Sequence, residues 1–469
     1  MSNYYDVHNH LFNKHFLGKE LLYRMMKELR KFIDLQKERS LDRGPDRGLK
    51  NVITSLKRYK KAIKVFTRQN SIAIYEELNK SYKGEFILTP LTFDLTYCFA
   101  PSADRDITTG SQDTVKQAIE DEMNVMFNMV EDQTRSMSRI FNPFADNDED
   151  KLWNEFLLEK EEFMKIAEDF QQSDETPDSD GTRGIFKKRS PSDGWNEQIR
   201  QIEELKKHPD YKDMVFPFLA IDPRRPGIAE YAKANVGKGK LFAGVKLYCP
   251  NGYSPTDPLL FGTEGKRDGI YAFCEDNGIP VTAHNSDGGF ATLAKSVVIN
   301  GLIHVNGKLI QLNNELLKFS KAITEKDAIY ERALAINHPL VWGKVAEKYP
   351  NLLLNLAHFG GGRQLEAAMD NPDNLNLWSN RIIELIKDSR YNVYTDVSCF
   401  SEFSSIDKLI ASKVYPEIKK RILYGSDYTL LLLFEDDFDE NIRQFRNKFG
   451  SDFDIIAREN PKEFLKHVI

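Results

Sequence analysis

The sequence predicts an α/β fold, a (β/α)8 TIM barrel in which eight parallel strands alternate with helices. Three observations predict it. Eight short apolar runs, each about one strand long, recur along the 469 residues. Several of these runs are almost continuously apolar, which is typical of strands buried on both faces. Helical patterns and polar turns separate them, and this alternation favours a parallel sheet closed into a barrel.

The spacing of the runs supports a barrel with added segments. The predicted strands are Tyr4–His8, Phe86–Asp94, Val215–Asp222, Phe242–Tyr248, Ile279–His284, Leu352–His358, Tyr391–Val397 and Ile422–Asp427. Most successive strand ends are separated by close to the ~31 residues that each unit of a plain ~250-residue barrel takes. The intervals from residue 8 to 94, from 94 to 222 and from 284 to 358 are much longer. We therefore expect helical insertions after the first, second and fifth strands.

These insertions belong to one barrel domain that spans residues 1–469. Their approximate bounds are 18–84, 95–214 and 290–327. The first is basic and helical, and the second carries helical patterns over Gln112–Phe141 and Glu149–Phe170. Because all three follow strands, we expect them on the C-terminal face of the barrel, where barrel enzymes bind substrate. They are also the segments that could mediate a homo-oligomer.

Composition excludes several classes of function. The net charge of -6, from 65 basic and 71 acidic residues, indicates neither a nucleic-acid surface nor a polybasic membrane surface. No apolar run reaches the ~18 residues of a membrane span, and the first residues lack the basic and apolar regions of a signal peptide. The four cysteines lie far apart, which suits a reducing cytosol. We expect a cytoplasmic protein that acts on a small molecule.

The first predicted strand carries a pair of histidines. Side chains of a strand alternate between its two faces, so His8 and His10 point the same way. Both imidazoles can therefore reach one metal ion, and neutral imidazole suits zinc, iron, nickel and manganese. Two surface histidines at this spacing would be equally ordinary, so the pair alone decides little.

Three further polar residues end apolar strands. His284 ends the fifth predicted strand, His358 ends the sixth, and Asp427 ends the eighth. Each histidine alone is better explained as a core residue with satisfied hydrogen bonds. Because the C-terminal ends of parallel strands meet at one face of a barrel, the set as a whole indicates a metal centre.

With these residues in place, the chain resembles the amidohydrolase superfamily of metal-dependent enzymes. It is most similar to the amidohydrolase-2 branch, which includes the aminocarboxymuconate semialdehyde decarboxylase-like enzymes. The connecting segments that carry the resemblance are Ile221–Pro226, Gly244–Tyr248, His338–Trp342, Tyr349–Pro350, Tyr424–Asp427 and Glu459–Pro461. The likeness covers all eight strands and none of the insertions. One departure is Thr429, where the branch often has proline.

The resemblance implies a catalytic metal, Zn²⁺ with Mn²⁺ or Fe²⁺ as alternatives. The implied ligands are His8, His10, His284 and Asp427, with His358 as ligand or catalytic partner. Asp427 would hold the metal and also take a proton from water. His358 would polarise the carbonyl or stabilise a developing oxyanion.

Lys246 leaves the number of metal ions open. It ends a short apolar strand, where a bare ammonium is costly to bury. In binuclear relatives the matching lysine is carboxylated and bridges two ions, in which case His284 and His358 would hold the second ion. In one-metal relatives the amine stays free, to form a salt bridge or to bind an anionic substrate.

Other polar residues are candidates for substrate binding or ligand positioning. Arg224 and Arg225 follow the third strand, and a guanidinium fork there could hold a substrate carboxylate or could remain a solvated loop charge. Tyr248 is a candidate for the barrel mouth. Asp94 and Asp396 could each orient a metal-binding histidine or cap a turn.

The leading interpretation is a metal-dependent hydrolase that cleaves an amide, lactam or ester bond in a small carboxylated substrate. The second is a metal-dependent non-oxidative decarboxylase, a lyase with the same ligands. A catalytically inactive barrel that acts as a scaffold is the alternative from another class, and a metal-independent lactonase is a minor fourth. Fold alone does not separate these, because one barrel hosts many chemistries.

Overall fold

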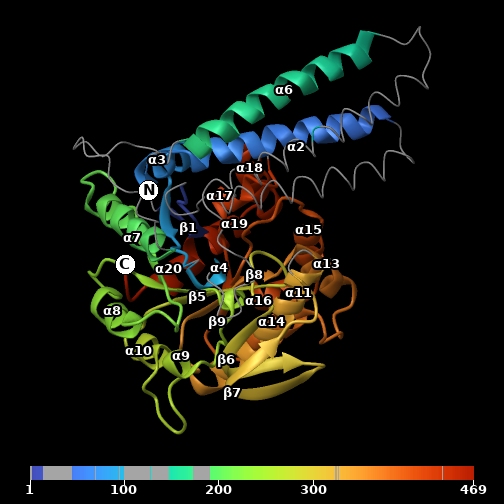
Figure 1. Cartoon of the computed structure of the whole chain (residues 1–469). Helices are drawn as coiled ribbons and strands as arrows, with labels where there is room; N and C mark the ends of the chain where they lie inside the picture. The colour runs from blue at the N-terminus through green and yellow to red at the C-terminus, as the bar shows by residue number, and fades with distance from the viewer. Residues whose placement is uncertain are drawn as a thin grey trace.

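The computed structural model describes residues 3–13, 45–68, 70–94, 96–99, 127, 147–172, 191–322, 325, 327–435 and 437–469 (Figure 1). Its parallel strands are β1 (Tyr4–Asn9), β2 (Phe86–Pro90), β3 (Phe218–Ala220), β4 (Gly244–Leu247), β5 (Val281–Ser286), β8 (Leu354–Gly360), β9 (Val393–Asp396) and β10 (Ile422–Leu423). Each of the eight predicted strands contains or overlaps one of them. Every residue is buried in the six parallel strands β3, β4, β5, β8, β9 and β10, as expected where helices cover the outside and side chains fill the inside.

The strands follow one another around a ring. Regular ladders order them as β1-β2 and as β10-β9-β8-β5-β4-β3, all parallel. Backbone hydrogen bonds cross both seams between these two sheets. The Val7 amide donates to the Tyr424 carbonyl at 3.1 Å, and the Thr92 amide donates to the Phe218 carbonyl at 3.0 Å. The prediction of a (β/α)8 barrel is therefore confirmed.

Helices surround the ring. In the first half of the chain they are α2 (Pro45–Phe66), α3 (Ser71–Ser81), α4 (Thr96–Phe99), α6 (Asn147–Gln172), α7 (Pro191–Lys207), α8 (Ile228–Asn235), η1 (Cys249–Asn251), α9 (Pro258–Phe261) and α10 (Ile270–Asp276). In the second half they are α11 (Ala328–Ile336), α12 (Pro339–Lys348), α13 (Gly362–Asp370), α14 (Trp378–Lys387), α15 (Ser404–Ala411), α16 (Tyr415–Ile418), η2 (Lys419–Arg421), α17 (Tyr428–Leu431), α18 (Phe438–Phe449), α19 (Asp452–Asp454), the π-helix η3 (Ile455–Glu459) and α20 (Asn460–Leu465). Among the described residues, no helix is long and apolar enough to cross a membrane.

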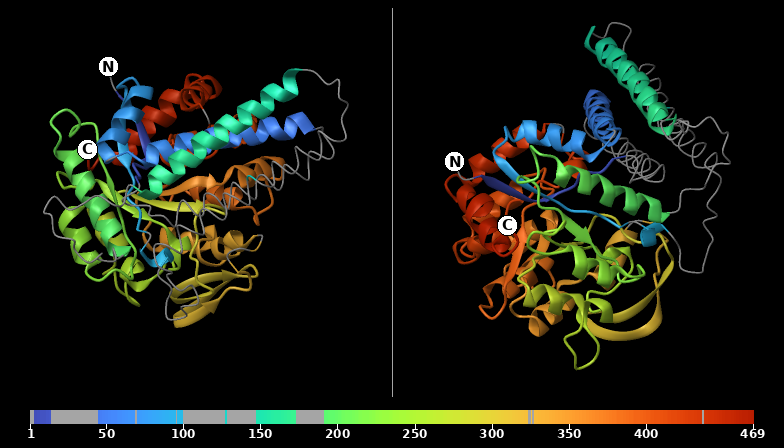
Figure 2. Two further views of the ribbon diagram at one scale, coloured as in Figure 1. Left: turned by 45° about the horizontal axis from the view of Figure 1, so that its top comes forward. Right: turned by 90° about the vertical axis from the view of Figure 1, so that its left-hand side faces the viewer.

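The two long helices that follow β1 and β2 lie side by side and project beyond the barrel (Figures 1 and 2). Lys60 of α2 pairs with Glu159 and Glu162 of α6, at 2.5 and 2.6 Å. Phe156 and Phe163 of α6 are buried, and both rings pack against Phe127. The expected helix over Glu149–Phe170 is therefore present as α6. Apart from Phe127, the expected helix over Gln112–Phe141 lies outside the described residues.

The segment after β5 differs from the expectation. In place of the expected helical insertion, residues 290–327 hold an antiparallel hairpin of β6 (Ser296–Val305) and β7 (Lys308–Lys318). Asn306 and Gly307 make its turn, with φ of 49° and 78°. Asn-Gly between apolar runs is the strongest short-range signal for such a turn. The helical expectation for this segment is wrong because it overlooks that signal.

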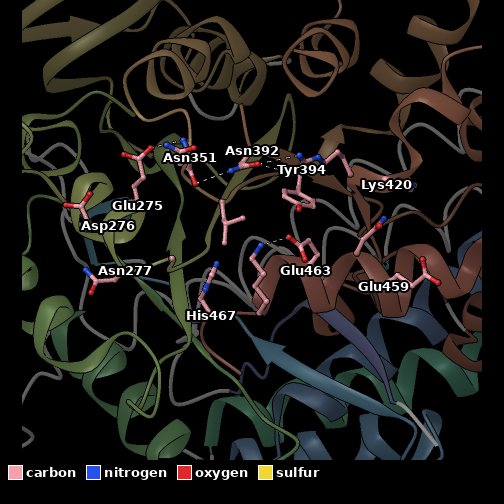
Figure 3. A pocket seen from close by; sticks show the side chains of 15 residues that line it. Glu275, Asp276, Asn277, Asn351, Asn392, Tyr394, Lys420, Glu459, Glu463 and His467 are labelled. Carbon is pink, nitrogen blue, oxygen red and sulfur yellow. Dashed lines mark hydrogen bonds and ion pairs between the residues drawn. The ribbon is translucent and has the colours of Figure 1, made fainter. Parts of the chain in front are cut away.

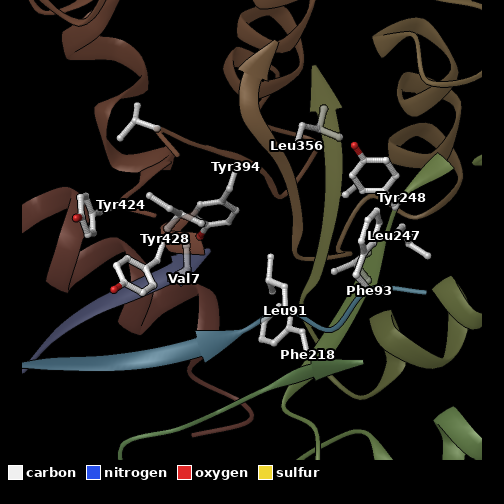
Figure 4. Close-up of a cluster of buried hydrophobic side chains, with 14 of the residues drawn as sticks. Val7, Leu91, Phe93, Phe218, Leu247, Tyr248, Leu356, Tyr394, Tyr424 and Tyr428 are labelled. Atoms are coloured by element: carbon white, nitrogen blue, oxygen red, sulfur yellow. The ribbon is translucent and has the colours of Figure 1, made fainter. Parts of the chain in front are cut away.

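Apolar side chains from many strands pack into one core (Figure 4). Val7 comes from β1, Phe218 from β3, Leu247 from β4 and Leu356 from β8, and each is completely buried. Polar side chains stand next to three of these apolar ones: Asp6 and His8 beside Val7, Lys246 beside Leu247, and Asn355 beside Leu356. As a result, a buried polar cluster forms at the C-terminal ends of the strands, and it contains the candidate site.

Candidate metal centre

Three potential metal ligands come together at the C-terminal ends of strands. His8 lies in β1, His358 in β8, and Asp427 follows β10. One ligand atom from each lies within 4.8 Å of the other two, and all three residues are buried. Strands far apart in the sequence are neighbours in the ring, so residues 8 and 427 meet.

The backbone turns sharply where these side chains emerge. His358 and Asp427 have positive φ angles of 67° and 55°, and Cys399 after β9 has 63°. Non-glycine residues seldom adopt this region, and such conformations cost about 1–3 kcal/mol each. At Asp427 the turn is held by its amide, which donates to the His8 carbonyl at 2.6 Å. The turn therefore ties the aspartate to the strand that carries the histidines.

His8 is oriented by a carboxylate. Its Nδ1 lies 3.0 Å from Asp396 Oδ2, and an ionised carboxylate can only accept, so Nδ1 carries the proton. Burial alone would raise the pKa of Asp396, but His8 beside it and hydrogen bonds from His8 and Ser398 outweigh burial and hold that pKa below its usual range. His8 Nε2 therefore presents a lone pair to the centre, 3.9 Å from Asp427 Oδ1.

His10 presents a lone pair to the same oxygen. Its Nδ1 lies 2.8 Å from the Leu91 carbonyl, which can only accept, so Nδ1 is the donor. Its Nε2 then carries a lone pair and lies 3.3 Å from Asp427 Oδ1, so neither atom has a proton to donate when the carboxylate is ionised. Asp427 Oδ1 is buried and has no hydrogen-bond partner. Acceptor atoms of His8, His10 and Asp427 thus face one another, an arrangement that a bound cation would stabilise.

The donor set fits a divalent metal such as zinc. Imidazole nitrogens and a carboxylate oxygen are ordinary ligands for such ions. Burial lowers the pKa of His10, His284 and His358 well below the usual range and so favours the neutral form that binds metal. Burial raises the pKa of Asp427, and the neighbouring His8 and Lys246 oppose this. The charge of a bound cation would favour the ionised carboxylate.

His284 lies beside the cluster but is turned away from it. Its ring centroid is 4.7 Å from that of His358. Its Nε2 faces the Gly288 carbonyl at 3.0 Å and the Ser286 hydroxyl at 3.3 Å. The structure therefore brings His8, His10, His358 and Asp427 together and places His284 at their edge.

Lys246 of β4 points into the centre. Its side chain is buried, and its Nζ lies 3.3 Å from His8 Nε2. Burial lowers the pKa of the amine to about 8, although the carboxylates of Asp396 and Asp427 act in the opposite direction. Lys246 thus lies at hydrogen-bond distance from one of the candidate ligands.

The candidate substrate-binding residues form two groups: Tyr248 lies beside a histidine of the candidate centre, and the two arginines do not. Tyr248 stacks on the His284 ring at 4.3 Å, and its hydroxyl accepts from the Phe290 amide at 2.7 Å. Both arginines instead pair with carboxylates of this chain. Arg224 makes two hydrogen bonds to Asp222, at 2.8 and 2.6 Å.

Arg225 makes two hydrogen bonds to Asp94, at 2.6 and 2.9 Å, and stacks over Trp195. Asp94 also accepts from the Thr96 amide, as a turn-capping residue does. Of the two aspartates with two possible roles, Asp396 contacts a histidine and Asp94 caps a turn.

Two polar residues beside the cluster are not among the sequence-based candidates. Ser398 Oγ lies 2.9 Å from His358 Nδ1 and donates to Asp396 Oδ1. The Asn355 amide donates to Asp396 Oδ2 at 2.7 Å. Ser398 follows Asp396 by two residues, the spacing at which strand residues share a face, so the position of Asp396 is the sequence signal for Ser398.

A separate hollow of about 820 Å³ lies at the other end of the barrel (Figure 3). Its lining includes Gly278, Asn351, Asn392 and Arg421, which precede β5, β8, β9 and β10. Barrel enzymes carry their active sites at the opposite, C-terminal face. We therefore place the candidate site by the chemistry of its donor atoms and not by the size of this hollow.

Comparison with known proteins gives one family. The sequence model described as amidohydrolase matches residues 167–465. A search of curated proteins finds no relative that matches.

Several solved structures resemble this one. A 2,6-dihydroxybenzoate decarboxylase complexed with 2,6-dihydroxybenzoate is 18% identical with a TM-score of 0.35, over 58% of this chain and 78% of that one. A putative 2-pyrone-4,6-dicarboxylic acid hydrolase from Pseudomonas putida is 11% identical with a TM-score of 0.31, over 58% of this chain and 77% of that one. At such scores we infer nothing about activity from the likeness.

Proposed function

The chain belongs to the amidohydrolase family, and from this premise we propose that it is a metal-dependent hydrolase. It would use metal-activated water to cleave an amide, lactam or ester bond in a small carboxylated substrate. The observation that carries the proposal is the set of facing acceptor atoms on His8, His10 and Asp427. A buried carboxylate oxygen without a hydrogen-bond donor, beside the Nε2 atoms of two histidines, is suited to hold a cation.

His8, His10, His358 and Asp427 would hold the ion, with His284 as a further ligand if its ring turns. A divalent ion in such a site lowers the pKa of bound water toward ~7 and polarises the scissile carbonyl. The second oxygen of Asp427 can accept the proton that water loses. Its position is set by the turn at φ 55° and by its amide bond to His8.

His358 is poised as an acceptor. Its Nδ1 faces the Ser398 hydroxyl and, at 3.4 Å, the Ser398 carbonyl, which can only accept. The proton therefore sits on Nδ1, and Nε2 carries the lone pair. In this form His358 can ligate the ion or take up a proton. To stabilise an oxyanion, as expected from the resemblance, Nε2 would first have to be protonated.

The second candidate is a metal-dependent decarboxylase. Lys246 Nζ lies 3.3 Å from His8 Nε2, and a lysine that stays an amine there would leave room for one ion and not for a bridged pair, which would favour the decarboxylase. The paired state of Arg224 and Arg225 means that a substrate carboxylate would bind at the metal or displace one of their aspartates.

Metal removal and restoration test the proposal. The purified protein should hydrolyse members of a panel of lactones, cyclic amides and esters, lose that activity with a chelator, and regain it with Zn²⁺, Mn²⁺ or Fe²⁺. Conversion only of enoic or aromatic acids, with release of carbon dioxide, would replace the hydrolase by the decarboxylase. Turnover that survives complete metal removal would contradict both.

A further inference from the structure

Ser398 joins two histidines of the candidate centre to a single carboxylate. Its hydroxyl lies 2.9 Å from His358 Nδ1, 3.2 Å from His8 Nδ1 and 2.5 Å from Asp396 Oδ1. Ser398 is only 1% exposed, so water does not compete for these contacts. A hydroxyl has one proton to donate and lone pairs to accept with. The direction of each bond can therefore be worked out from the partners.

The proton of Ser398 goes to Asp396. That carboxylate accepts from the His358 amide at 2.9 Å, from the Asn355 amide at 2.7 Å and from His8 Nδ1 at 3.0 Å. A carboxylate surrounded by donors is ionised and can only accept. Ser398 must then donate to Asp396, which leaves only its lone pairs for the histidines.

His358 must consequently donate from Nδ1. The Ser398 hydroxyl oxygen accepts at 2.9 Å, and the Ser398 carbonyl, an obligate acceptor, lies 3.4 Å from the same nitrogen. Both neighbours select the tautomer with the proton on Nδ1. Nε2 is then the nitrogen whose lone pair is free, on the side of the ring away from Ser398.

We propose that Ser398 is a positioning residue that fixes the Nδ1-protonated tautomer of His358 and couples it, through Asp396, to His8. One carboxylate then orients both imidazoles, His8 directly and His358 through the serine hydroxyl. This inference rests on the proposed function, because it assumes that the Nε2 lone pairs of His8 and His358 bind a divalent cation. Hydrogen-bond partners of metal-binding histidines set ring orientation and tautomer in this way.

The test uses Ser398→Ala, with Ser398→Thr as the conservative variant and Ser405→Ala, a buried serine on α15, as the matched control. Alanine is smaller than serine, so the variant should fold. ¹⁵N spectra of metal-free, histidine-labelled protein report the tautomer of His358, assigned by comparison with His358→Gln. Competition with a chromophoric chelator reports zinc affinity. Neither readout needs a substrate.

We expect the Nδ1-protonated form of His358 in the wild type and in Ser405→Ala. In Ser398→Ala the Nδ1-protonated fraction should fall, because only the more distant backbone carbonyl, at 3.4 Å, remains as an acceptor. Zinc affinity should fall about 10–100-fold in Ser398→Ala, the range found when a ligand's hydrogen-bond partner is removed. Ser398→Thr should restore both. An Nε2-protonated His358 in the wild type, or unchanged tautomer and affinity in Ser398→Ala, would overturn the inference.

The two proposals fail in different ways. If the wild type binds no zinc, the proposed function fails while the spectrum still decides the tautomer. If zinc binds equally tightly with and without the hydroxyl, the positioning role fails and the proposed function stands. Should Ser398→Thr misfold because its added methyl group meets Gly425, Ser398→Ala and the wild-type spectrum still decide the question.

Discussion

Asp427 Oδ1 is the atom on which the candidate centre depends most. It is buried without a hydrogen-bond partner. It lies 3.3 Å from His10 Nε2 and 3.9 Å from His8 Nε2. Leaving a buried polar group unpaired costs about 1–3 kcal/mol. An ion that all three atoms share would remove this cost, and the same atoms would then carry the chemistry.

Asp427→Asn should separate metal binding from folding. The side-chain amide can donate to His10 Nε2, so the unfavourable contact is relieved, and the metal-free variant should be at least as stable as the metal-free wild type. Zinc affinity should fall by more than about 100-fold, beyond the loss typical for a ligand's hydrogen-bond partner, and turnover should vanish. Chelator competition and urea unfolding measure the two effects.

The matched control is Asp276→Asn, the same chemical change at the opposite end of the barrel, where the side chain is 64% exposed. It should leave affinity and turnover unchanged. If Asp427→Asn bound zinc as tightly as this control, Asp427 would not be a ligand.

At the scale of elements, the segment between β10 and α17 has to pass very close to β1. A Cβ on Gly425 would lie 2.5 Å from the His8 Cβ and 3.2 Å from the His8 amide nitrogen. Gly425 thus lets the chain carry Asp427 up to the histidines. This requirement concerns space, which no local pattern in the sequence reveals.

Gly425→Ala should therefore destabilise the fold by about 1–3 kcal/mol, the usual range for overpacking, and weaken zinc binding by displacing His8. Gly343→Ala in α12 is the control, because its nearest neighbour would be 3.8 Å away and alanine favours a helix. Denaturant unfolding should show opposite signs for the two variants. Equal stability of both would show that the space beside His8 is not limiting.

The hairpin β6–β7 meets α12 through two stacked imidazoles. The His304 and His338 rings lie 3.8 Å apart and nearly parallel, with the edge of Trp378 against His338. His338 also caps α12, since its Nδ1 accepts from the Leu340 amide at 3.2 Å. A protonated Nδ1 could not accept this bond. Burial, with the nearby charges of His304 and Arg381, lowers the pKa of His338 to about 3.

This depressed pKa predicts a loss of stability in acid. The ordinary histidine pKa is 6.5, so between about pH 6.5 and 3 the unfolded chain binds a proton at His338 that the folded protein does not. The stabilisation is complete above pH 6.5 and declines as the pH falls. His338→Asn keeps a capping acceptor and removes the titration, so it should reduce the loss between pH 7 and 5 by up to about 2 kcal/mol.

Urea unfolding of metal-free wild type and His338→Asn at the two pH values measures this difference. The buried histidines of the metal centre titrate in both proteins and cancel in the comparison. Identical pH dependence in the two proteins would show that the pKa of His338 is the same in the folded and the unfolded state, and would contradict this prediction.

At the scale of the whole molecule, the ring is well predicted from the sequence because its signals are local. Apolar runs mark the strands, and a polar residue at the end of a run marks the C-terminal face, so His8, His358 and Asp427 can be grouped from the sequence alone. The direction in which a side chain points is not determined by the local sequence. Whether Asp94 or Asp396 meets a histidine depends on which strands become neighbours.

Other parts of the site escape prediction for the same reason. Arg225 is held by Asp94, which lies 131 residues away, and His284 Nε2 turns toward the loop that follows β5. The hairpin is different, because its Asn306-Gly307 turn is a local signal that makes it predictable.

Because the strands form a ring, the candidate metal centre joins residues from the two ends of the sequence. His8 lies near one end of the sequence and Asp427 near the other, and the seam between β1 and β10 brings them together. A shared ion would therefore tie the first strand to the last. At a free concentration 100 times its Kd, such an ion would stabilise the fold by about 2.7 kcal/mol.

The most direct test of a metal centre is the metal content per chain of the purified protein, measured by elemental mass spectrometry beside Asp427→Asn. We predict at least one equivalent of a divalent transition metal in the wild type and its loss in the variant. Two equivalents would add a carboxylated Lys246 that bridges them, and one would leave Lys246 as an amine. A wild type that carries no metal and takes up none when zinc is supplied would contradict the proposed function.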